Sequence, residues 1–390
     1  MKRKPRIAIL SLNYLIQYSP SVRNMANFFA RSGINTTIIV DEIKSDVERE
    51  LPKVKIVRLI PEKISVVRNL ICGAFVRIPY LGRYILSGVN ILYSFMSAPT
   101  IFYRLEKIVN NYDYVICVEI KALDTLSKSE FPLNKAIFFS LELEQYISQY
   151  VLNDVKKLVR GCAFCIIQNA ERGRNFSKLI GTKLSYEYYP VSIPPLNINT
   201  KKRKTNHLEI VYSGSITEWS YLLDFVKVIK QFPDDNSINV SIFGRVLGPR
   251  KYIDQITEVI KNDKRFTVDT SYKTDIELLK HLKNADIGLA LYKKPNNEKN
   301  WDNLITSSGK IAFYSWSGLG ILTNLKESGT QDPPFLYVKD VDKHDVEMVL
   351  HIFNKKREMY GEKSTDLAKK KYNSNVYLGN ILKRIQTHEI

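Results

Sequence analysis

One segment, residues 306–322, combines residue types that favour the binding of an anion. Its polar part, here called the SSGK segment, consists of Ser307, Ser308, Gly309 and Lys310. The spacing predicts a short helix that begins at Lys310, ends at Gly318 and leads into a buried strand. Serines before a helix can cap its free N–H groups, and the N-terminal end of a helix favours negative charge. Together with the lysine charge, these features suit a phosphate or diphosphate, and an ordinary capped helix between two loops is the alternative.

A second pair of reactive side chains, Cys162 and Cys165, forms a single CxxC on an apolar, strand-like run. A zinc site would need two more ligands, and no histidine precedes His207. The sequence therefore favours two buried cysteines over a metal or redox site. With four cysteines and no signal-peptide pattern after the basic N-terminus, we expect a reducing, cytoplasmic environment without disulfides.

The elements that must position these side chains alternate between strands and helices. In the first half, apolar and β-branched runs predict strands at residues 6–11, 36–40, 55–59, 114–118, 136–140 and 164–168. Helical spacing covers residues 21–32, and Gly33 ends that helix. Strands separated by helices predict a parallel sheet that is covered on both faces.

The alternation stops near residue 195 and starts again after a polar, basic run. The second half is expected to contain strands at 209–212, 239–243, 266–269 and 287–292, with helices at 221–231, 252–262 and 275–284. We therefore expect an N-terminal domain at 1–195, a linker at 196–206, a second domain at 207–370 and a C-terminal helix at 371–390. The predicted fold class is α/β, with two Rossmann-like doubly wound domains facing a cleft and the C-terminal helix crossing back to the first domain.

The composition is that of a globular protein with an excess of positive charge. The 58 Lys and Arg residues against 40 Asp and Glu give a formal net charge of +18, which attracts nucleic acid, anionic headgroups or phosphorylated small molecules. The sequence lacks GxGxxG after the first strand of either half and lacks GxxxxGK[ST], which argues against nicotinamide or flavin enzymes and P-loop nucleotidases. It contains no recognised nucleic-acid module, so nucleic acid is a disfavoured partner.

A stretch without acidic residues lies between Glu62 and Glu106, and residues 84–103 carry no charge. That length could span a bilayer, but the stretch also contains several polar residues. Basic and aromatic-aliphatic helices often lie in the membrane interface, and helices that cover a domain are the other alternative. We predict that this stretch docks the protein on an anionic membrane, and flotation with anionic liposomes at low salt tests this.

Several short motifs, taken together in order, resemble the glycosyltransferases of the GT-B fold, in the large family-4 group. They are SPSVR at 19–23, SLELE at 140–144, IIQNAER at 166–172, YSGS at 212–215 and ADIGL at 285–289, followed by the SSGK segment. The resemblance covers nearly the whole chain, and it rests on the order and spacing of the motifs. It implies that the second domain binds a nucleotide sugar and that the first binds the acceptor.

The resemblance also implies roles for individual residues. The donor-binding residues would be Gly214, Ser215, Tyr272, Ser307, Ser308, Gly309 and Lys310. The acceptor-binding residues would be Asn13 and Arg23, and the catalytic group would be Lys310, Arg245, Glu119 and Glu142. The main-chain N–H groups of the SSGK segment and the Lys310 ammonium would hold the diphosphate, while Gly214 would let the main chain approach it from the other side.

Two departures from the family pattern affect the expected chemistry. The usual E-x7-E pair would fall at Ile305 and Phe313, which are not acidic, and the basic pair that usually follows the glycine turn at Gly214 is missing. Lys310, Arg245 and the helix end must then balance the charge of the leaving diphosphate. The departures fit either a divergent active enzyme or a domain that binds without turnover.

The predicted function is sugar transfer from a nucleotide sugar to a glycan or lipid-linked acceptor in cell-surface polysaccharide synthesis. Inverting transfer needs a general base, and the acceptor half has no histidine, so only carboxylates could serve. Retention of configuration, which the resemblance implies, is therefore favoured. We expect no metal or cofactor besides the co-substrate, and a cytoplasmic or peripheral membrane location. The alternative is a catalytically silent partner subunit of an active glycosyltransferase.

Overall fold

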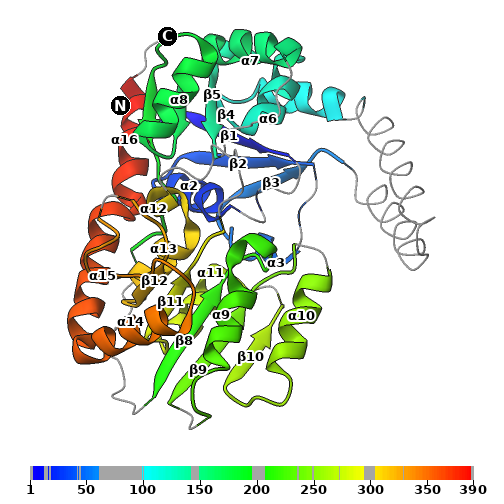
Figure 1. Cartoon of the computed structure of the whole chain (residues 1–390). Coiled ribbons are helices and arrows are strands. Elements are labelled where there is room, and N and C mark those ends of the chain that lie inside the picture. Colours follow the sequence, from blue (N-terminus) through cyan, green and yellow to red (C-terminus); the bar gives the residue numbers. More distant parts are fainter. Residues whose placement is uncertain are drawn as a thin grey trace, which may run out of the picture. The chain divides into compact units, whose positions relative to one another are not determined.

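The computed structural model describes residues 3–12, 16, 19–41, 43, 45–60, 99, 101–141, 149–195, 207–234, 237–247, 250–271, 273–293, 304–327 and 329–387. The chain divides into two compact units (Figure 1). Unit 1 comprises Met1–Tyr189 and Val376–Ile390, and unit 2 comprises Pro190–Asn375. The predicted linker at 196–206 lies outside the described residues.

The described part of unit 1 contains a seven-stranded parallel sheet. Its strands are β1 (Arg6–Ser11), β2 (Asn35–Val40), β3 (Lys55–Arg58), β4 (Tyr114–Val118), β5 (Ala136–Ser140), β6 (Phe164–Ile167) and β7 (Tyr186–Tyr188). They are arranged in the order β3-β2-β1-β4-β5-β6-β7, so the order reverses between β1 and β4. Consecutive residues of β1, from Ile7 to Leu10, have no exposed surface. Both faces of the sheet are therefore covered, as the alternating pattern predicts.

The helices of unit 1 lie between these strands in the sequence, except for the last one. They are α2 (Pro20–Arg31), α3 (Ser45–Glu48), α6 (Glu119–Ser127), α7 (Gln149–Gly161), α8 (Ala170–Ile180) and α16 (Ser374–Thr387), together with the short η1 (Leu133–Lys135). Near the end of α16, Arg384 donates a hydrogen bond of 2.9 Å to Glu187, and its guanidinium lies 4.3 Å from the centre of the Phe164 ring. The predicted return of the C-terminal helix to the first domain is thus confirmed.

Unit 2 repeats this topology in its described residues, with a six-stranded parallel sheet. The strands are β8 (Leu208–Ser213), β9 (Ile238–Phe243), β10 (Phe266–Asp269), β11 (Ile287–Ala290), β12 (Gly320–Thr323) and β13 (Phe335–Tyr337). Their order, β10-β9-β8-β11-β12-β13, is the 3-2-1-4-5-6 order of a Rossmann fold. The predicted α/β class with two Rossmann-like doubly wound sheets is confirmed.

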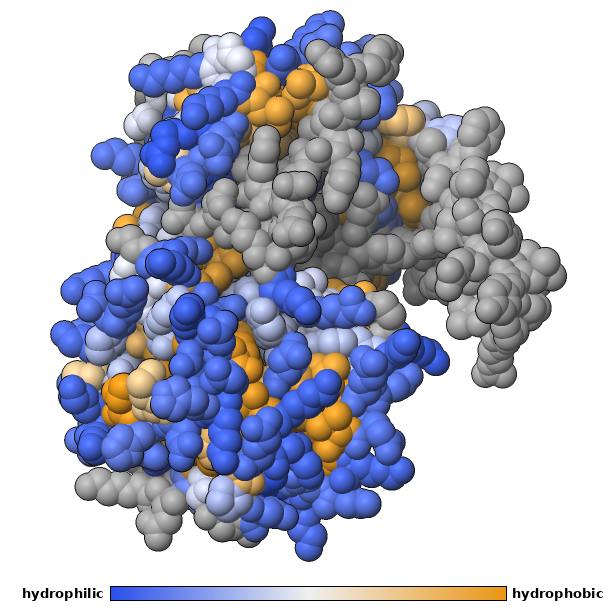
Figure 2. Space-filling view, in the orientation of Figure 1, coloured by the Kyte–Doolittle hydropathy of each residue, from blue (hydrophilic) through white to orange (hydrophobic). Residues whose placement is uncertain are grey.

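The helices of unit 2 lie between successive strands in the sequence, except for α14 and α15, which follow the last strand, β13. They are η2 (Glu218–Ser220), α9 (Leu222–Ile229), α10 (Arg250–Ile260), α11 (Asp275–Leu282), α12 (Leu304–Ser307), α13 (Gly309–Trp316), α14 (Lys343–Lys355) and α15 (Arg357–Lys371). The sequence did not predict the three-residue strands β7 and β13, because such short runs give no measurable period. Hydrophilic residues cover most of the coloured surface visible in Figure 2, with smaller apolar areas between them.

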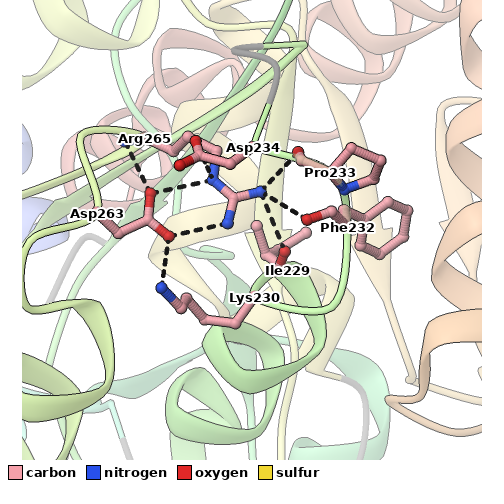
Figure 3. A network of polar contacts seen from close by, with 7 residues as sticks. All are labelled: Ile229, Lys230, Phe232, Pro233, Asp234, Asp263 and Arg265. Atoms are coloured by element: carbon pink, nitrogen blue, oxygen red, sulfur yellow. Dashed lines mark hydrogen bonds and ion pairs between the residues drawn. The ribbon is translucent and has the colours of Figure 1, made fainter.

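A buried ionic network ties the end of α9 to the start of β10 (Figure 3). The Arg265 and Asp263 side chains are both 2% exposed and form an ion pair of 2.8 Å, and Lys230 reaches the same carboxylate at 2.9 Å. The Arg265 guanidinium also donates to three main-chain carbonyls, those of Ile229, Phe232 and Pro233. Arg265 therefore binds carbonyls at the last residue of α9 and in the turn that follows it, where the main chain has left the helical hydrogen-bond pattern.

The cysteines of the CxxC lie in the core of unit 1. Cys165 is buried in β6 and Cys162 is half-buried after α7, and both are free thiols. Burial raises the pKa of Cys165 to about 12 and raises the pKa of Cys162 still further. The described residues contain no group of three or more His, Cys, Asp or Glu side chains placed to hold a metal ion. The interpretation of the pair as packed cysteines is the one that this environment favours.

None of the helices that the structure describes is long and apolar enough to cross a membrane. Most of the acid-free stretch, at residues 61–98 and 100, lies outside the described residues. Its predicted docking on a membrane therefore stays a prediction.

Candidate functional site

The candidate site lies in unit 2, at the carboxyl ends of β8 and β11. The strand order reverses between these two neighbours, and open α/β sheets bind ligands at the carboxyl ends of strands beside such a reversal. β8 ends at Ser213 and leads into Gly214, while β11 ends at Ala290 and leads to Tyr292. The SSGK segment joins this edge because α13 packs against both β11 and β12.

Glycines allow the main chain to approach closely at this edge. Gly214 has φ +134°, and a Cβ there would lie 2.7 Å from Cε of Lys310. A Cβ on Gly244 would lie 1.9 Å from the main-chain oxygen of Gly214. Two glycines therefore keep β8 and β9 together and leave the room that the Lys310 side chain occupies.

The SSGK segment is arranged differently from the expected polar loop. Ser307 is the last residue of α12, Ser308 is the N-cap of α13, and α13 begins at Gly309 rather than at Lys310. The expected side-chain capping by serine is wrong, because the Ser308 side chain makes no cap hydrogen bond and instead pairs with the Tyr292 hydroxyl. The hydroxyl is thereby withdrawn from the N–H groups of the first turn of α13.

The Lys310 side chain is the most unusual group of the site. It is only 9% exposed, and no described residue accepts a hydrogen bond from its Nζ atom. Three rings surround Nζ, with centres 4.5 Å (Tyr212), 5.1 Å (Trp219) and 4.9 Å (Tyr292) away. We call these three rings the aromatic cage. All three distances are within the range of a cation–π interaction.

Burial brings the pKa of this amine close to neutral pH. Removal from water lowers the pKa of Lys310 from its usual value to about 7. The ring faces of the aromatic cage act in the opposite direction, because they attract the ammonium form. A bound anion would favour the ammonium form in the same way, so the free amine is prepared to gain a proton when an anion arrives.

Tyr314 fixes α13, and with it Lys310, on the sheet. Its hydroxyl accepts a 2.8 Å hydrogen bond from the Ser213 main-chain N–H and donates to the Leu289 carbonyl at 3.2 Å. Its ring covers Gly288, where a Cβ would lie 2.4 Å from the ring atoms. The helix is thus attached to both strands that flank the reversal of strand order.

The two positions that correspond to the glutamate pair of family-4 glycosyltransferases are apolar and enclosed. Ile305 and Phe313 are each 5% exposed and belong to the hydrophobic core of unit 2. A carboxylate does approach α12, since Glu327 accepts hydrogen bonds from the N–H groups of Leu304 (2.7 Å) and Ile305 (3.2 Å). It comes from the loop after β12, a position that the sequence pattern did not single out.

The other predicted donor-side residues lie at the same edge or outside the described residues. The main chains of Ser215 and Arg245 are near one another, because the next residue, Ile216, donates 2.8 Å to the Arg245 carbonyl. The Arg245 side chain is half-buried. Tyr272 lies outside the described residues, and beside it Asp269 accepts hydrogen bonds from Ser271 and Lys273.

In unit 1, Glu119 occupies the corresponding reversal point between β1 and β4. It is the first residue of α6, has φ +64°, is 8% exposed, and accepts a hydrogen bond from the Leu141 N–H at 2.5 Å. A positive φ in a residue other than glycine marks a strained main chain, often found at functional sites. Leu141, which follows β5, also accepts a 2.6 Å hydrogen bond at its carbonyl from Arg172 of α8.

The remaining acceptor-side predictions differ in outcome. Asn13 and Glu142 lie outside the described residues. Arg23 is 4% exposed in α2, where its Nε atom lies 3.2 Å from a Glu50 carboxylate oxygen and its Nη1 donates to the Ile16 carbonyl. Arg23 is therefore engaged in a buried ion pair.

Sequence reasoning missed the aromatic cage. Tyr212 ends the run that precedes the glycine turn, and Tyr292 ends the ADIGLALY run, so each looked like an ordinary strand residue. Trp219 lies in the segment after Gly214 where the basic pair is missing, and no sequence pattern assigned it a role. The available signal was the recurrence of a large aromatic residue at or just after the ends of two strands that the fold makes neighbours.

Comparisons with known proteins agree with this architecture. No protein-family model matches the chain, and no curated protein sequence is significantly similar to it. Among solved structures, HepE from Anabaena in complex with UDP and glucose has a TM-score of 0.67 at 11% identity, over 98% of this chain and 100% of that one. A glycosyltransferase from Rickettsia africae has a TM-score of 0.67 at 11% identity, over 99% of this chain and 100% of that one.

A third similar structure is the α,α-trehalose 6-phosphate synthase of Burkholderia multivorans. It has a TM-score of 0.61 at 9% identity, over 99% of each chain. At these identities the similarities concern the fold. The two-domain Rossmann-like fold of this chain is therefore one that glycosyltransferases share.

Proposed function

We propose that this protein is a glycosyltransferase that uses a nucleotide sugar, with the donor diphosphate bound at the SSGK segment of unit 2. The observation that carries the proposal is the Lys310 amine, which is buried and has no hydrogen-bond acceptor among the described residues, beside the Gly214 turn at the reversal of the sheet. A phosphate oxygen is the kind of acceptor that such a donor needs.

The chemistry follows from where negative charge develops. When the sugar leaves the donor, charge builds up on the diphosphate, and a cation together with helix N–H groups stabilises that charge. Lys310 and the first turn of α13 would supply both, with Arg245 as a further cation. The likeness to HepE, whose structures contain UDP with glucose or UDP-glucose, supports the assignment of a nucleotide sugar.

We further propose that transfer retains the anomeric configuration. Glu119 directly follows β4 at the reversal point of unit 1, and it already accepts a hydrogen bond from Leu141. Retention does not require a strong base, because the leaving phosphate can take the acceptor proton. The proposed acceptor is a glycan or a membrane-borne lipid, and the net charge of +18 supports a location at an anionic membrane surface. The proposal includes no metal ion.

Nucleotide binding provides the direct test. Thermal-shift and calorimetric titrations with UDP-, GDP- and other nucleotide sugars should identify one nucleotide that stabilises the wild-type protein. In the Lys310→Ala variant its affinity should fall about tenfold to a hundredfold, as expected for a lost charge-assisted hydrogen bond. Lys343→Ala, which removes a lysine above the Phe232 ring, is the matched control and should bind normally. Undiminished binding by Lys310→Ala would contradict the site assignment.

A catalytically silent subunit is the second candidate, and one observation favours it. Ile305 and Phe313 are packed in the core, so neither presents a polar group at the positions where the family carries its paired glutamates. Release of nucleoside diphosphate from the donor, with water or crude lipid acceptors, separates the two functions. An active enzyme should release nucleoside diphosphate, and the Lys310→Ala variant should release less. A silent subunit should bind the nucleotide sugar and release no nucleoside diphosphate. NMR of the sugar product then reports its configuration.

A further inference from the structure

The walls of the aromatic cage are joined to the SSGK segment itself. The Trp219 and Tyr292 rings lie parallel within 3°, with centres 6.2 Å apart. The Tyr292 hydroxyl pairs with Ser308, the residue that precedes α13. Lys293, the residue after Tyr292, donates its N–H to the Trp219 carbonyl at 2.8 Å. The main chains that carry the Trp219 and Tyr292 rings are therefore also connected.

Tyr292 is held in place from its other side by an amide. The Asn324 side chain accepts 2.9 Å from the Tyr292 N–H and donates 2.8 Å to the Tyr292 carbonyl. These two bonds extend the pairing of β11 with β12 beyond Ala290 and Thr323, where the strand register ends. The ring therefore has a fixed main chain, a fixed hydroxyl and a parallel neighbour.

We propose that Trp219 and Tyr292 are positioning residues, which hold the Lys310 amine beside Gly214 and away from water until an anion binds. The proposal rests on the proposed nucleotide site, since it explains how the amine of that site is stored. An amine that is shielded from water gives up little hydration when a phosphate oxygen approaches. Where the free amine is neutral it takes up a proton as the anion binds, so anion binding and protonation are coupled.

The groups that face the amine are consistent with such coupling. The phenols of Tyr212 and Tyr292 stay neutral, because burial raises the pKa of each. Tyr314, on the sheet side, is likewise neutral for the same reason. Glu327 affects Tyr292 from the loop after β12 and is bonded to the first N–H groups of α12. Because these phenols stay neutral, the group near the amine whose charge an anion can change on binding is Lys310 itself.

Amine acetylation followed by peptide mass spectrometry tests the cage without any ligand. In the wild-type protein, sulfosuccinimidyl acetate should modify Lys310 at least tenfold more slowly than the exposed Lys339. In Trp219→Ala and Tyr292→Ala, Lys310 should react at a rate within about threefold of Lys339. Tyr292→Phe keeps the ring and should protect Lys310. Phe232→Ala, which removes a ring 5.7 Å from the Lys343 amine, is the matched control and should also protect it.

The outcomes are separable from folding defects. Trp219 is only half-buried, so its replacement tests the cage even where the buried Tyr292→Ala variant does not fold. The proposal is overturned if wild-type Lys310 reacts as fast as Lys339. It is also overturned if Lys310 stays protected in a folded Trp219→Ala protein.

The pH dependence of UDP binding supplies the readout that a purely structural role would not change. Wild-type affinity should fall by about tenfold per pH unit above pH 7, since the amine must acquire a proton. In Trp219→Ala the amine is hydrated and charged, so this fall should largely disappear between pH 7 and 9. An unchanged pH profile in that variant contradicts the positioning role. If wild-type protein binds no UDP or other nucleotide, the proposed function fails, while the acetylation result still decides the cage.

Discussion

The sequence indicated that Lys310 is a binding residue, but it did not indicate the hydration or protonation of the amine. The SSGK spacing predicted a cation at the start of a helix, and the structure places it there. That this cation is dehydrated depends on three rings from separate parts of unit 2. Its chemistry is therefore decided by neighbours that no local motif contains.

The first prediction at this scale concerns the stability of the protein against pH. Lys310 has a pKa of about 7 in the folded protein and an ordinary, higher value when unfolded. Between pH 7 and about 10 the unfolded chain binds more protons, so the contribution of Lys310 to the free energy of unfolding rises with pH. Urea unfolding at pH 7, 8 and 9 should show this rise in wild type relative to Lys310→Met.

The comparison with Lys310→Met isolates one group. The buried cysteines and tyrosines have raised pKa values and change stability in the opposite direction, but they are present in both proteins. A constant difference between wild type and Lys310→Met across this pH range would show that the amine is not dehydrated in the folded state.

A second prediction at this scale concerns Gly214. Gly214→Ala would force a Cβ to within 2.7 Å of Lys310 Cε at a φ of +134°. We expect destabilisation by about 1–3 kcal/mol and a displaced Lys310, with nucleotide affinity reduced at least tenfold. Calorimetric titration and urea unfolding measure the two effects. Gly379→Ala is the matched control, because nothing lies within 4 Å of its Cβ position, and it should leave binding unchanged.

At the scale of elements, buried and half-buried polar side chains determine how helices are attached to their neighbours. Tyr314 attaches α13 to β8 and β11, Glu327 caps α12, and Arg265 closes the end of α9. Tyr314 belongs to the helix that it attaches, whereas Glu327 and Arg265 lie outside α12 and α9. Helix and strand positions followed from periodicity, but these attachments did not, since they join residues far apart in the chain.

The prediction at this scale concerns the network in Figure 3. Asp263→Asn keeps the shape but removes the charge that pairs with the buried Arg265, which should cost about 3–5 kcal/mol of unfolding free energy. Glu258→Gln, in a pair whose side chains are 64% and 76% exposed, should cost well under about 1 kcal/mol. Urea denaturation of both variants gives the comparison, and similar losses would refute a special role for the buried pair.

The same network predicts a loss of stability in acid. The Arg265 guanidinium holds the pKa of Asp263 far below its usual range. Its stabilising contribution is therefore complete above the ordinary pKa of an aspartate, near pH 4, and is lost as the pH falls further. Asp263→Asn should abolish that part of the acid dependence.

For the molecule as a whole, the periodicity and breaks of the sequence were enough to predict the fold class and most of the helices and strands. Strands such as β1, β4, β5 and β10 have the predicted bounds, because each is an apolar run between clear breaks. The strand order, and with it the reversal between β8 and β11, was not predicted, because doubly wound sheets occur with more than one order. The sequence did predict that the site lies at the carboxyl ends of the strands and at the SSGK segment.

The contents of that site depend on how distant parts of the chain pack together. It withdrew the Ser308 hydroxyl from capping, placed Arg23 in a buried ion pair, and gathered Tyr212, Trp219 and Tyr292 around Lys310. The physical reason is that periodicity records which face of an element is buried, whereas hydration, charge and hydrogen bonding depend on which distant residues share that burial. A motif could identify the cation, and packing determined its protonation.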